Sequence, residues 1–269
     1  MPRPIYNAQL QAEYQRLFDT CHITPNLYPA VDKYVDMILK GRSRYEAVGA
    51  KLNIPWYFIG LTHCMEGNCN FTKHLHNGDP LTARTVQVPK NRPAQGNPPF
   101  TWEVSAEDAL RYQGLDKWTD WGIPGMLYQL EAYNGYGYRY LKAPNVPINS
   151  PYLWSFSNIY TKGKYTSDGK YSATAVSKQC GVAVMLRRIF EKQLATTDTN
   201  ADPLAMLKQL GKEVNYAPSR YVAKAEELQR QLNLNGAILK VDGKAGKISS
   251  DAYKKLVGEY LHGDPREGT

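Results

Sequence analysis

The chain has no long apolar run. Its most apolar stretch, Trp56 to Leu61, is far shorter than the ~20 residues that a membrane-spanning helix requires. The opening residues, MPRPIYNAQLQAEYQ, lack the apolar segment of a secretory signal, which predicts synthesis in the cytoplasm without a signal peptide. The sequence therefore predicts no integral membrane segment and leaves the route of any export open.

Motifs for thiol chemistry and nucleic-acid binding are also missing. The four cysteines form no CxxC pair, which argues against thioredoxin-type chemistry and most structural zinc knuckles. Lys and Arg number 33 against 25 Asp and Glu, a net charge of +8 that favours polyanionic partners. These charges are scattered, and no helix-turn-helix, zinc-finger or RNP pattern occurs, so we expect no nucleic-acid partner.

Apolar spacing and turn residues divide the 269 residues into helical and irregular stretches. Helical spacing covers most of residues 7–51, and a further helix begins near Pro55 and ends at Gly67. Alternation in TARTVQVP predicts a short β element between residues 70 and 104. The prediction is a mainly α (α+β) domain at residues 1–200, a linker at 201–220 and a small helical module at 221–269.

Glu66 stands at the predicted exposed end of the helix that begins near Pro55. Cleavage of a glycosidic bond needs a carboxylic acid that protonates the leaving oxygen, and apolar surroundings raise the pKa of such an acid. A second carboxylate serves as nucleophile or as base for water. Asp79 is the nearest candidate for that role, with Glu131 and Asp108 as rivals.

The segment GLTHCMEGNCNF resembles the region around the catalytic Glu of lysozyme-like muramidases and lytic transglycosylases, and LEAYNGYGY is similar to the Ala-Tyr-Asn-Ala-Gly segment of the latter. The run from Trp56 to Tyr171 resembles phage-type endolysins and related bacterial lysozyme-like proteins. This resemblance implies a lysozyme-like fold and cleavage of the MurNAc-GlcNAc strand of peptidoglycan. Gly67 stands where the transglycosylases have Ser, so hydrolysis and transglycosylation both stay open.

Sugar-binding residues are expected around this acid. The resemblance implies that Tyr133 and Asn134 position the sugar or orient Glu66, although a packed ring and a helix cap are the alternative. The chain has 20 Tyr against six Phe, and rings beside turn residues suit the faces of sugars. The full set of substrate-binding candidates is Tyr133, Asn134, Tyr138, Tyr152, Trp154 and Tyr160.

A zinc-dependent wall amidase or peptidase is the rival hypothesis. His63, Cys64, Cys69, His74 and His76 fall within one short segment, and neutral His and thiolate are zinc ligands. Adjacent His63 and Cys64 point about 100° apart on a helix, and the spacing matches no familiar zinc signature. We therefore predict no metal or other cofactor, and free thiols rather than a disulfide between Cys64 and Cys69.

Residues 225–256 resemble the small helical peptidoglycan-binding module. The shared features are Leu228-Gln229, Asp242-Gly243, Gly246 and Ser249-Ser250, with Tyr253 or Tyr260 in place of the family's terminal ring. A tight Asp-Gly turn and a Ser helix cap also explain the pattern, so a pair of docking helices is the alternative. The resemblance implies a monomer that acts on the cell wall, in the periplasm or outside the cell; a non-catalytic wall-binding protein is the third hypothesis.

Overall fold

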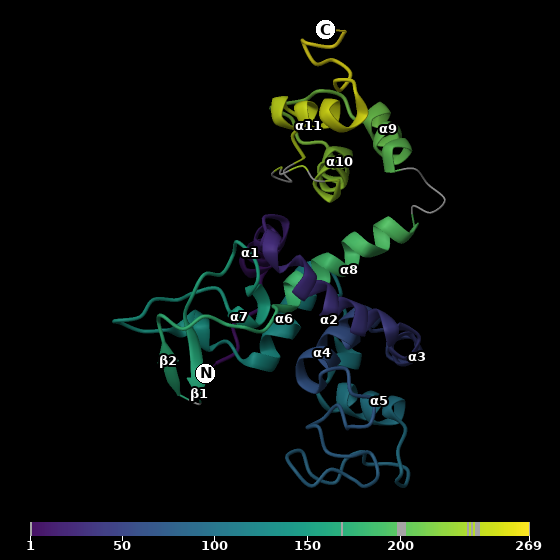
Figure 1. The fold of residues 1–269 in the computed structure, drawn as a ribbon, viewed down its shortest axis with the longest axis vertical. Helices are drawn as coiled ribbons and strands as arrows, with labels where there is room; N and C mark the ends of the chain where they lie inside the picture. Colours follow the sequence, from purple (N-terminus) through teal and green to yellow (C-terminus); the bar gives the residue numbers. More distant parts are fainter. Residues whose placement is uncertain are drawn as a thin grey trace. The chain divides into compact units, whose positions relative to one another are not determined.

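The computed structural model divides the chain into two compact units, Met1–Ile189 and Phe190–Thr269. It describes residues 2–167, 169–197, 203–235, 237, 239 and 243–268. The fold is mainly helical, which confirms the predicted class at that level (Figure 1).

The regular structure of the first unit is mainly α-helical, with short 3-10 helices between the α-helices. The α-helices are α1 (Ala8–Asp19), α2 (Tyr28–Lys40), α3 (Arg42–Leu52), α4 (Trp56–Gly67), α5 (Trp102–Tyr112), α6 (Ile123–Asn134), α7 (Pro151–Trp154) and α8 (Val182–Thr197), the last of which continues past the end of the unit. The 3-10 helices are η1 (Pro25–Leu27), η2 (Leu115–Lys117) and η3 (Gly137–Tyr140). Helix α1 packs on α6, while α4 packs on α2 and α3.

Two helices are buried on every side. The seven consecutive residues Phe58–Cys64 of α4 are all buried, and so are the seven residues Gly125–Glu131 of α6. A helix without a polar face belongs to the interior of a domain rather than to its surface. Gly60 allows the close packing of α4, because a Cβ at this position would lie 2.7 Å from the Ile38 side chain. Helix α4 therefore runs through the core and reaches solvent only at its ends.

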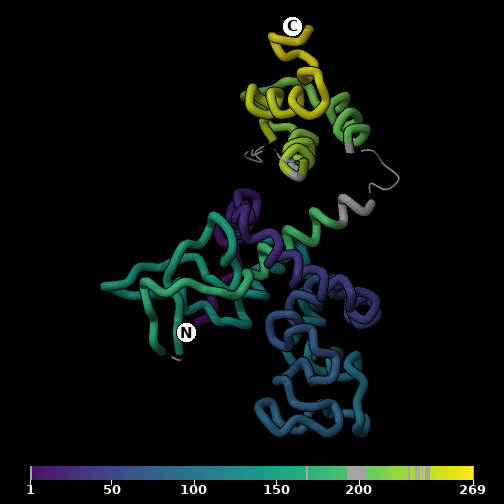
Figure 2. Tube along the Cα trace, viewed as in Figure 1, coloured from purple at the N-terminus to yellow at the C-terminus, as the bar shows by residue number. Residues whose placement is uncertain are grey.

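The β element predicted between residues 70 and 104 is wrong. This segment is irregular between α4 and α5, with one isolated bridge between Lys73 and Pro80 (Figure 2). Its prolines remove the amide donors that a strand ladder needs. The described residues place their two strands later, as an antiparallel pair of β1 (Lys164–Ser167) and β2 (Lys170–Ser172), with Tyr165 opposite Tyr171.

The second unit consists of α9 (Pro203–Glu213), α10 (Ala223–Leu234) and α11 (Lys247–Val257). Its apolar core includes Leu207 and Leu210 from α9, Leu228 and Leu232 from α10, and Tyr253 from α11. Helix α9 therefore belongs to this module's core, whereas the sequence predicted a linker at residues 201–220. The predicted turn residue Asp242 lies outside the described residues.

A buried ion pair joins α6 to the segment after it. The Arg139 guanidinium donates to Glu131 Oε2 at 2.9 Å and to Glu13 Oε1 at 2.7 Å, and the Tyr14 hydroxyl donates to the same Glu131 carboxylate. Glu131 is only 1% exposed. A carboxylate at such a depth depends on its partners for the interactions that water would supply.

We predict that Arg139→Met destabilises the protein by about 3–5 kcal/mol, because it leaves the Glu131 carboxylate buried without its cation. The matched control is Arg111→Met, which removes an exposed ion pair to Asp116 (3.2 Å) and should cost ~1 kcal/mol or less. Urea unfolding at neutral pH measures both. Equal losses for the two variants would contradict the structural role assigned to the buried pair.

Candidate active site

Glu66 lies in the last turn of α4, which ends at Gly67 as predicted. The chain then takes two left-handed residues, Asn68 (φ 50°) and Cys69 (φ 55°). Their amides donate back to the Cys64 carbonyl at 3.1 Å and the His63 carbonyl at 3.2 Å. These bonds satisfy carbonyls that a helix end otherwise leaves unpaired, and they fix the turn that carries Glu66.

Two predicted tyrosines meet at this carboxyl group. Tyr152, on the one-turn helix α7, donates its hydroxyl proton to Glu66 Oε1 at 2.9 Å. Tyr133, in the last turn of α6, lies close enough for the charge of Glu66 to raise the pKa of its hydroxyl, after the larger effect of burial. The Tyr133 hydroxyl donates to the side chain of Gln113, which caps the C-terminus of α5. Tyr133 therefore links the C-terminal ends of α5 and α6 and lies near α4.

The electrostatics of this site favour a proton on Glu66. The side chain is exposed to solvent, yet the surrounding protein displaces enough water to raise the pKa of its carboxyl, against the lowering effect of the Tyr152 hydroxyl. Helix C-termini carry partial negative charge, which acts in the same direction as the desolvation. The site thus combines an accessible acid with surroundings that disfavour its ionised form.

Three of the aromatic candidates are core residues, so the prediction that Trp154 and Tyr160 are exposed sugar-stacking rings is wrong. Trp154 is 1% exposed, Tyr138 5% and Tyr160 8%. Tyr138 packs against Tyr165 and Tyr171 and accepts the Tyr165 amide at 3.1 Å. Trp154 and Tyr138 therefore offer no free face to a sugar, whereas Tyr160 borders the hollow described below.

Asn134 and Asp79 occupy different surroundings. Asn134 is exposed at the end of α6, one residue after Tyr133. Asp79 accepts the amides of Val86 and Gln87 at 2.8 and 3.0 Å and the side-chain amide of Asn77 at 3.0 Å. These bonds lower the pKa of the Asp79 carboxyl and hold its own irregular segment together.

The two rival carboxylates are engaged in ion pairs. Glu131 is the buried partner of Arg139 described above. Asp108 accepts two bonds from the Arg92 guanidinium, both at 2.8 Å, and one from His76 Nε2 at 2.8 Å. Both carboxylates therefore have structural partners that a catalytic role would require them to give up.

The His and Cys residues of the zinc hypothesis do not converge. His63 is a neutral ring within an aromatic cluster, since burial lowers its pKa to about 4. His74 uses both ring nitrogens, on Ser105 Oγ and the Ala83 carbonyl, each at 2.8 Å. Cys64 and Cys69 are neighbouring free thiols. In the described part of the chain, no three His, Cys, Asp or Glu side chains form a group that could hold a metal ion.

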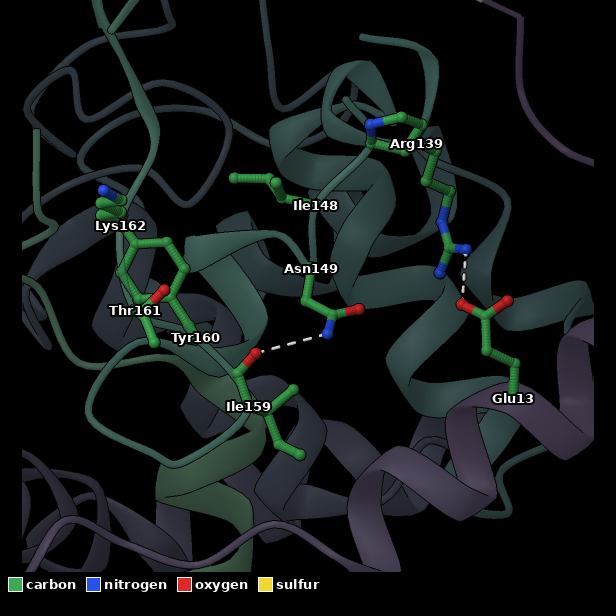
Figure 3. A pocket seen from close by; sticks show the side chains of 9 residues that line it. Glu13, Arg139, Ile148, Asn149, Ile159, Tyr160, Thr161 and Lys162 are labelled. Atoms are coloured by element: carbon green, nitrogen blue, oxygen red, sulfur yellow. Dashed lines mark hydrogen bonds and ion pairs between the residues drawn. The ribbon is translucent and has the colours of Figure 1, made fainter. Parts of the chain in front are cut away.

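A separate hollow of about 430 Å³ lies beside the buried ion pair (Figure 3). Arg139 and Glu13 form one side of it, and Lys162 lies on another. Asn149 spans its floor and donates to the Ile159 carbonyl at 3.3 Å. Glu66 is not part of the lining, so this hollow is distinct from the acid site.

The second unit carries a hollow of about 320 Å³ beside the start of α11. Its lining includes Gln229 and Ser249, which the module resemblance singled out, with Lys244, Lys247 and Ile248. Gln229 donates to Ser249 Oγ at 3.1 Å and accepts the Gly243 amide at 2.9 Å. The predicted motif therefore joins α10 to the turn before α11 and also borders a surface hollow.

Sequence reasoning missed Gln113 as a partner of Tyr133, because the bond joins the ends of α5 and α6 and no local pattern marks it. Comparison with protein-family models, curated proteins and solved structures finds no match. Among the described residues, no helix is long and apolar enough to cross a bilayer.

We predict that Tyr152→Phe raises the pKa of Glu66 further. The Tyr152 hydroxyl donates to Glu66 and so favours the ionised carboxylate, while the desolvation caused by the ring stays in place. Carboxyl ¹³C chemical shifts measured against pH report the change, and the Glu66 signal is assigned by its loss in Glu66→Gln. An unchanged or lower pKa in Tyr152→Phe would show that this hydrogen bond does not act on the acid.

Proposed function

We propose that this chain cleaves the glycan strand of bacterial peptidoglycan, in a lysozyme-like fold with Glu66 as general acid. The observation that carries the proposal is the state of Glu66: a solvent-exposed carboxyl, raised in pKa, at the C-terminus of a helix that is otherwise buried. An acid whose surroundings favour the protonated form and that still reaches solvent meets the two requirements of a proton donor to a bulky substrate.

In the proposed step, Glu66 gives its proton to the oxygen between two sugars as the bond from that oxygen to the anomeric carbon breaks. The leaving sugar departs with a new hydroxyl, and the other sugar develops positive charge at its ring. The partial negative charge at the ends of α4, α5 and α6 stabilises the positive charge on the sugar ring. The newly ionised Glu66 carboxylate stabilises that positive charge as well. Tyr152 donates to the same carboxylate and stabilises it once it has lost its proton.

The step that follows needs either water and a second carboxylate or a hydroxyl of the sugar itself. Glu131 and Asp108 are committed to ion pairs, and Asp79 is bound to the amides of its own segment. These commitments favour attack by the sugar's own hydroxyl on the anomeric carbon, in which the ionised Glu66 takes the proton of that hydroxyl, so that a single acid suffices. We therefore propose lytic transglycosylation, with Asp79 as the carboxylate to test should the products show hydrolysis.

The second unit is the proposed wall-binding module. Its hollow combines two lysines with amide and hydroxyl groups and the exposed apolar side chain of Ile248, which is 71% exposed. Lysines of this kind attract the anionic wall, and the exposed Ile248 side chain offers an apolar surface beside them.

We predict that Glu66→Gln lowers the rate of wall lysis by about 10²–10⁴-fold, because the amide cannot give up a proton. Turbidity of purified cell walls measures lysis, and Glu107→Gln, which weakens a surface ion pair to Lys51, is the matched control. Mass analysis of the products distinguishes anhydro ends, expected from transglycosylation, from reducing ends.

The same variant should be at least as stable as the parent chain at pH 7. A carboxyl whose pKa is raised by folding stabilises the fold below its unfolded pKa, and that stabilisation is lost as pH rises through the folded value. Replacement by Gln removes the cost at neutral pH, and the difference should shrink in acid. Full lytic activity in a well-folded Glu66→Gln protein would exclude Glu66 as the acid.

We predict that Ile248→Ser weakens binding to wall fragments by roughly two- to tenfold, because the exposed apolar side chain in the hollow is lost. Co-sedimentation with purified walls measures binding, in the Glu66→Gln background so that the walls are not digested. Ile5→Ser is the control, since Ile5 is 81% exposed in the first unit. Equal affinity of both variants would remove this hollow from the proposal.

A further inference from the structure

A hollow of about 470 Å³ lies at the start of α4, and Trp56 and Trp121 form part of its wall. Its volume falls in the ~300–1,000 Å³ range of small-ligand sites. Trp56 is the first residue of α4, and Glu66 follows ten positions later. At 1.5 Å per residue, the hollow lies about 15 Å along the helix from the proposed acid. The hollow is therefore separate from the site at Glu66.

Both tryptophan rings are held in place and half-buried. The Arg42 guanidinium lies 4.9 Å from the centroid of the Trp56 ring, and Arg42 Nε pairs with Glu46 Oε1 at 2.6 Å. Trp121 packs edge-on against Phe58 of α4, with ring centroids 4.8 Å apart. The indole nitrogen of Trp121 is shielded from solvent, so the accessible part of this ring is carbon. The hollow thus presents preformed apolar ring surface.

Polar side chains border the rings. Glu46 and Asn53 belong to the same hollow, together with the apolar Ile54 and Pro55. Asn53 is fixed by the left-handed turn (φ 56°) that ends α3. A carboxylate and an amide at the edge of an aromatic wall provide acceptors and a donor around an apolar face.

We infer that this hollow is a saccharide-binding site, separate from the site of cleavage. A pyranose ring has an apolar C–H face that matches an indole, and a rim of hydroxyls that can donate to Glu46 and bond Asn53. A purely apolar side chain would bury the Glu46 carboxylate without new hydrogen bonds, which is costly. A nucleic-acid strand needs a surplus of positive charge, whereas Glu46 neutralises the neighbouring Arg42. A neutral sugar meets both constraints, and the proposed wall glycan contains such sugars.

The test is a titration of ¹⁵N-labelled full-length Glu66→Gln protein with the β-1,4-linked trimer of N-acetylglucosamine. The chain has five tryptophans, whose indole N–H signals are assigned by single Trp→Phe variants. The signals of Trp56 and Trp121 should shift saturably. Trp118, whose indole donates to the Asp120 carbonyl at 2.6 Å, and the buried Trp102 and Trp154 should not. Uniform or absent shifts would overturn the inference.

Variants identify the contacts. Trp56→Ala should weaken the trimer's effect on the Trp121 signal at least about fivefold, and Trp56→Phe should retain most of it. Tyr112→Ala, which removes a ring 59% exposed outside the hollow, should change nothing. Should Trp56→Ala lose its helical circular dichroism, Glu46→Ala takes its place, and Trp121→Phe is read from the Trp56 signal. Unchanged affinity in folded variants of the hollow would contradict the assignment.

The occupant and the proposed function are tested separately. N-acetyl-leucine amide serves as the apolar competitor: a saturable shift with this probe and none with the sugar would assign the hollow to an apolar side chain instead. The titration does not involve catalysis, so sugar-dependent shifts at Trp56 in a chain that fails to lyse walls would leave this site in place while the proposed cleavage fails. Lysis of walls without such shifts would support the proposed cleavage and overturn the saccharide site at Trp56.

Discussion

The first unit depends on the burial of α4. Seven consecutive residues of this helix lie in the core, so its direction is fixed by contacts on all sides rather than along one face. A helix held in this way can end in solvent without losing its position. The exposed Glu66 therefore has an orientation set by the interior of the domain, although its carboxyl is accessible.

The same arrangement explains how an accessible carboxyl can favour its protonated form. Full burial would raise the pKa of the carboxyl further. It would also make the carboxyl inaccessible to a polymeric substrate, as the buried Glu131 is. Full exposure would leave the pKa ordinary. The last turn of α4 provides an intermediate environment, in which the surrounding protein displaces water from Glu66 and the helix C-terminus adds partial negative charge. The Tyr152 hydroxyl limits the shift, so the acid can also lose its proton.

Local signals predicted the position of Glu66 but not most of its surroundings. The Pro that precedes α4 and the Gly that ends it are positional preferences of single residues, and both helix limits follow from them. Alternation in TARTVQVP predicted a strand. The prolines on either side lack the amide donors that strand pairing needs, and Asp79 instead holds the loop by accepting backbone amides. The exposure of Trp154 and Tyr160 depends on which segments fold over them, and spacing along the chain carries no such information.

Trp56 and Glu66 lie at the two ends of α4, and the helix sets the distance between them. Because the helix is rigid and buried, the ~15 Å between Trp56 and Glu66 is a constant of the fold rather than a property of loops. A sugar held at the Trp56 hollow and a bond cleaved at Glu66 would then be separated by a fixed distance. Such a spacing favours long strands over short ones, because only a long chain can engage both ends at once and gain from the second contact at high effective concentration.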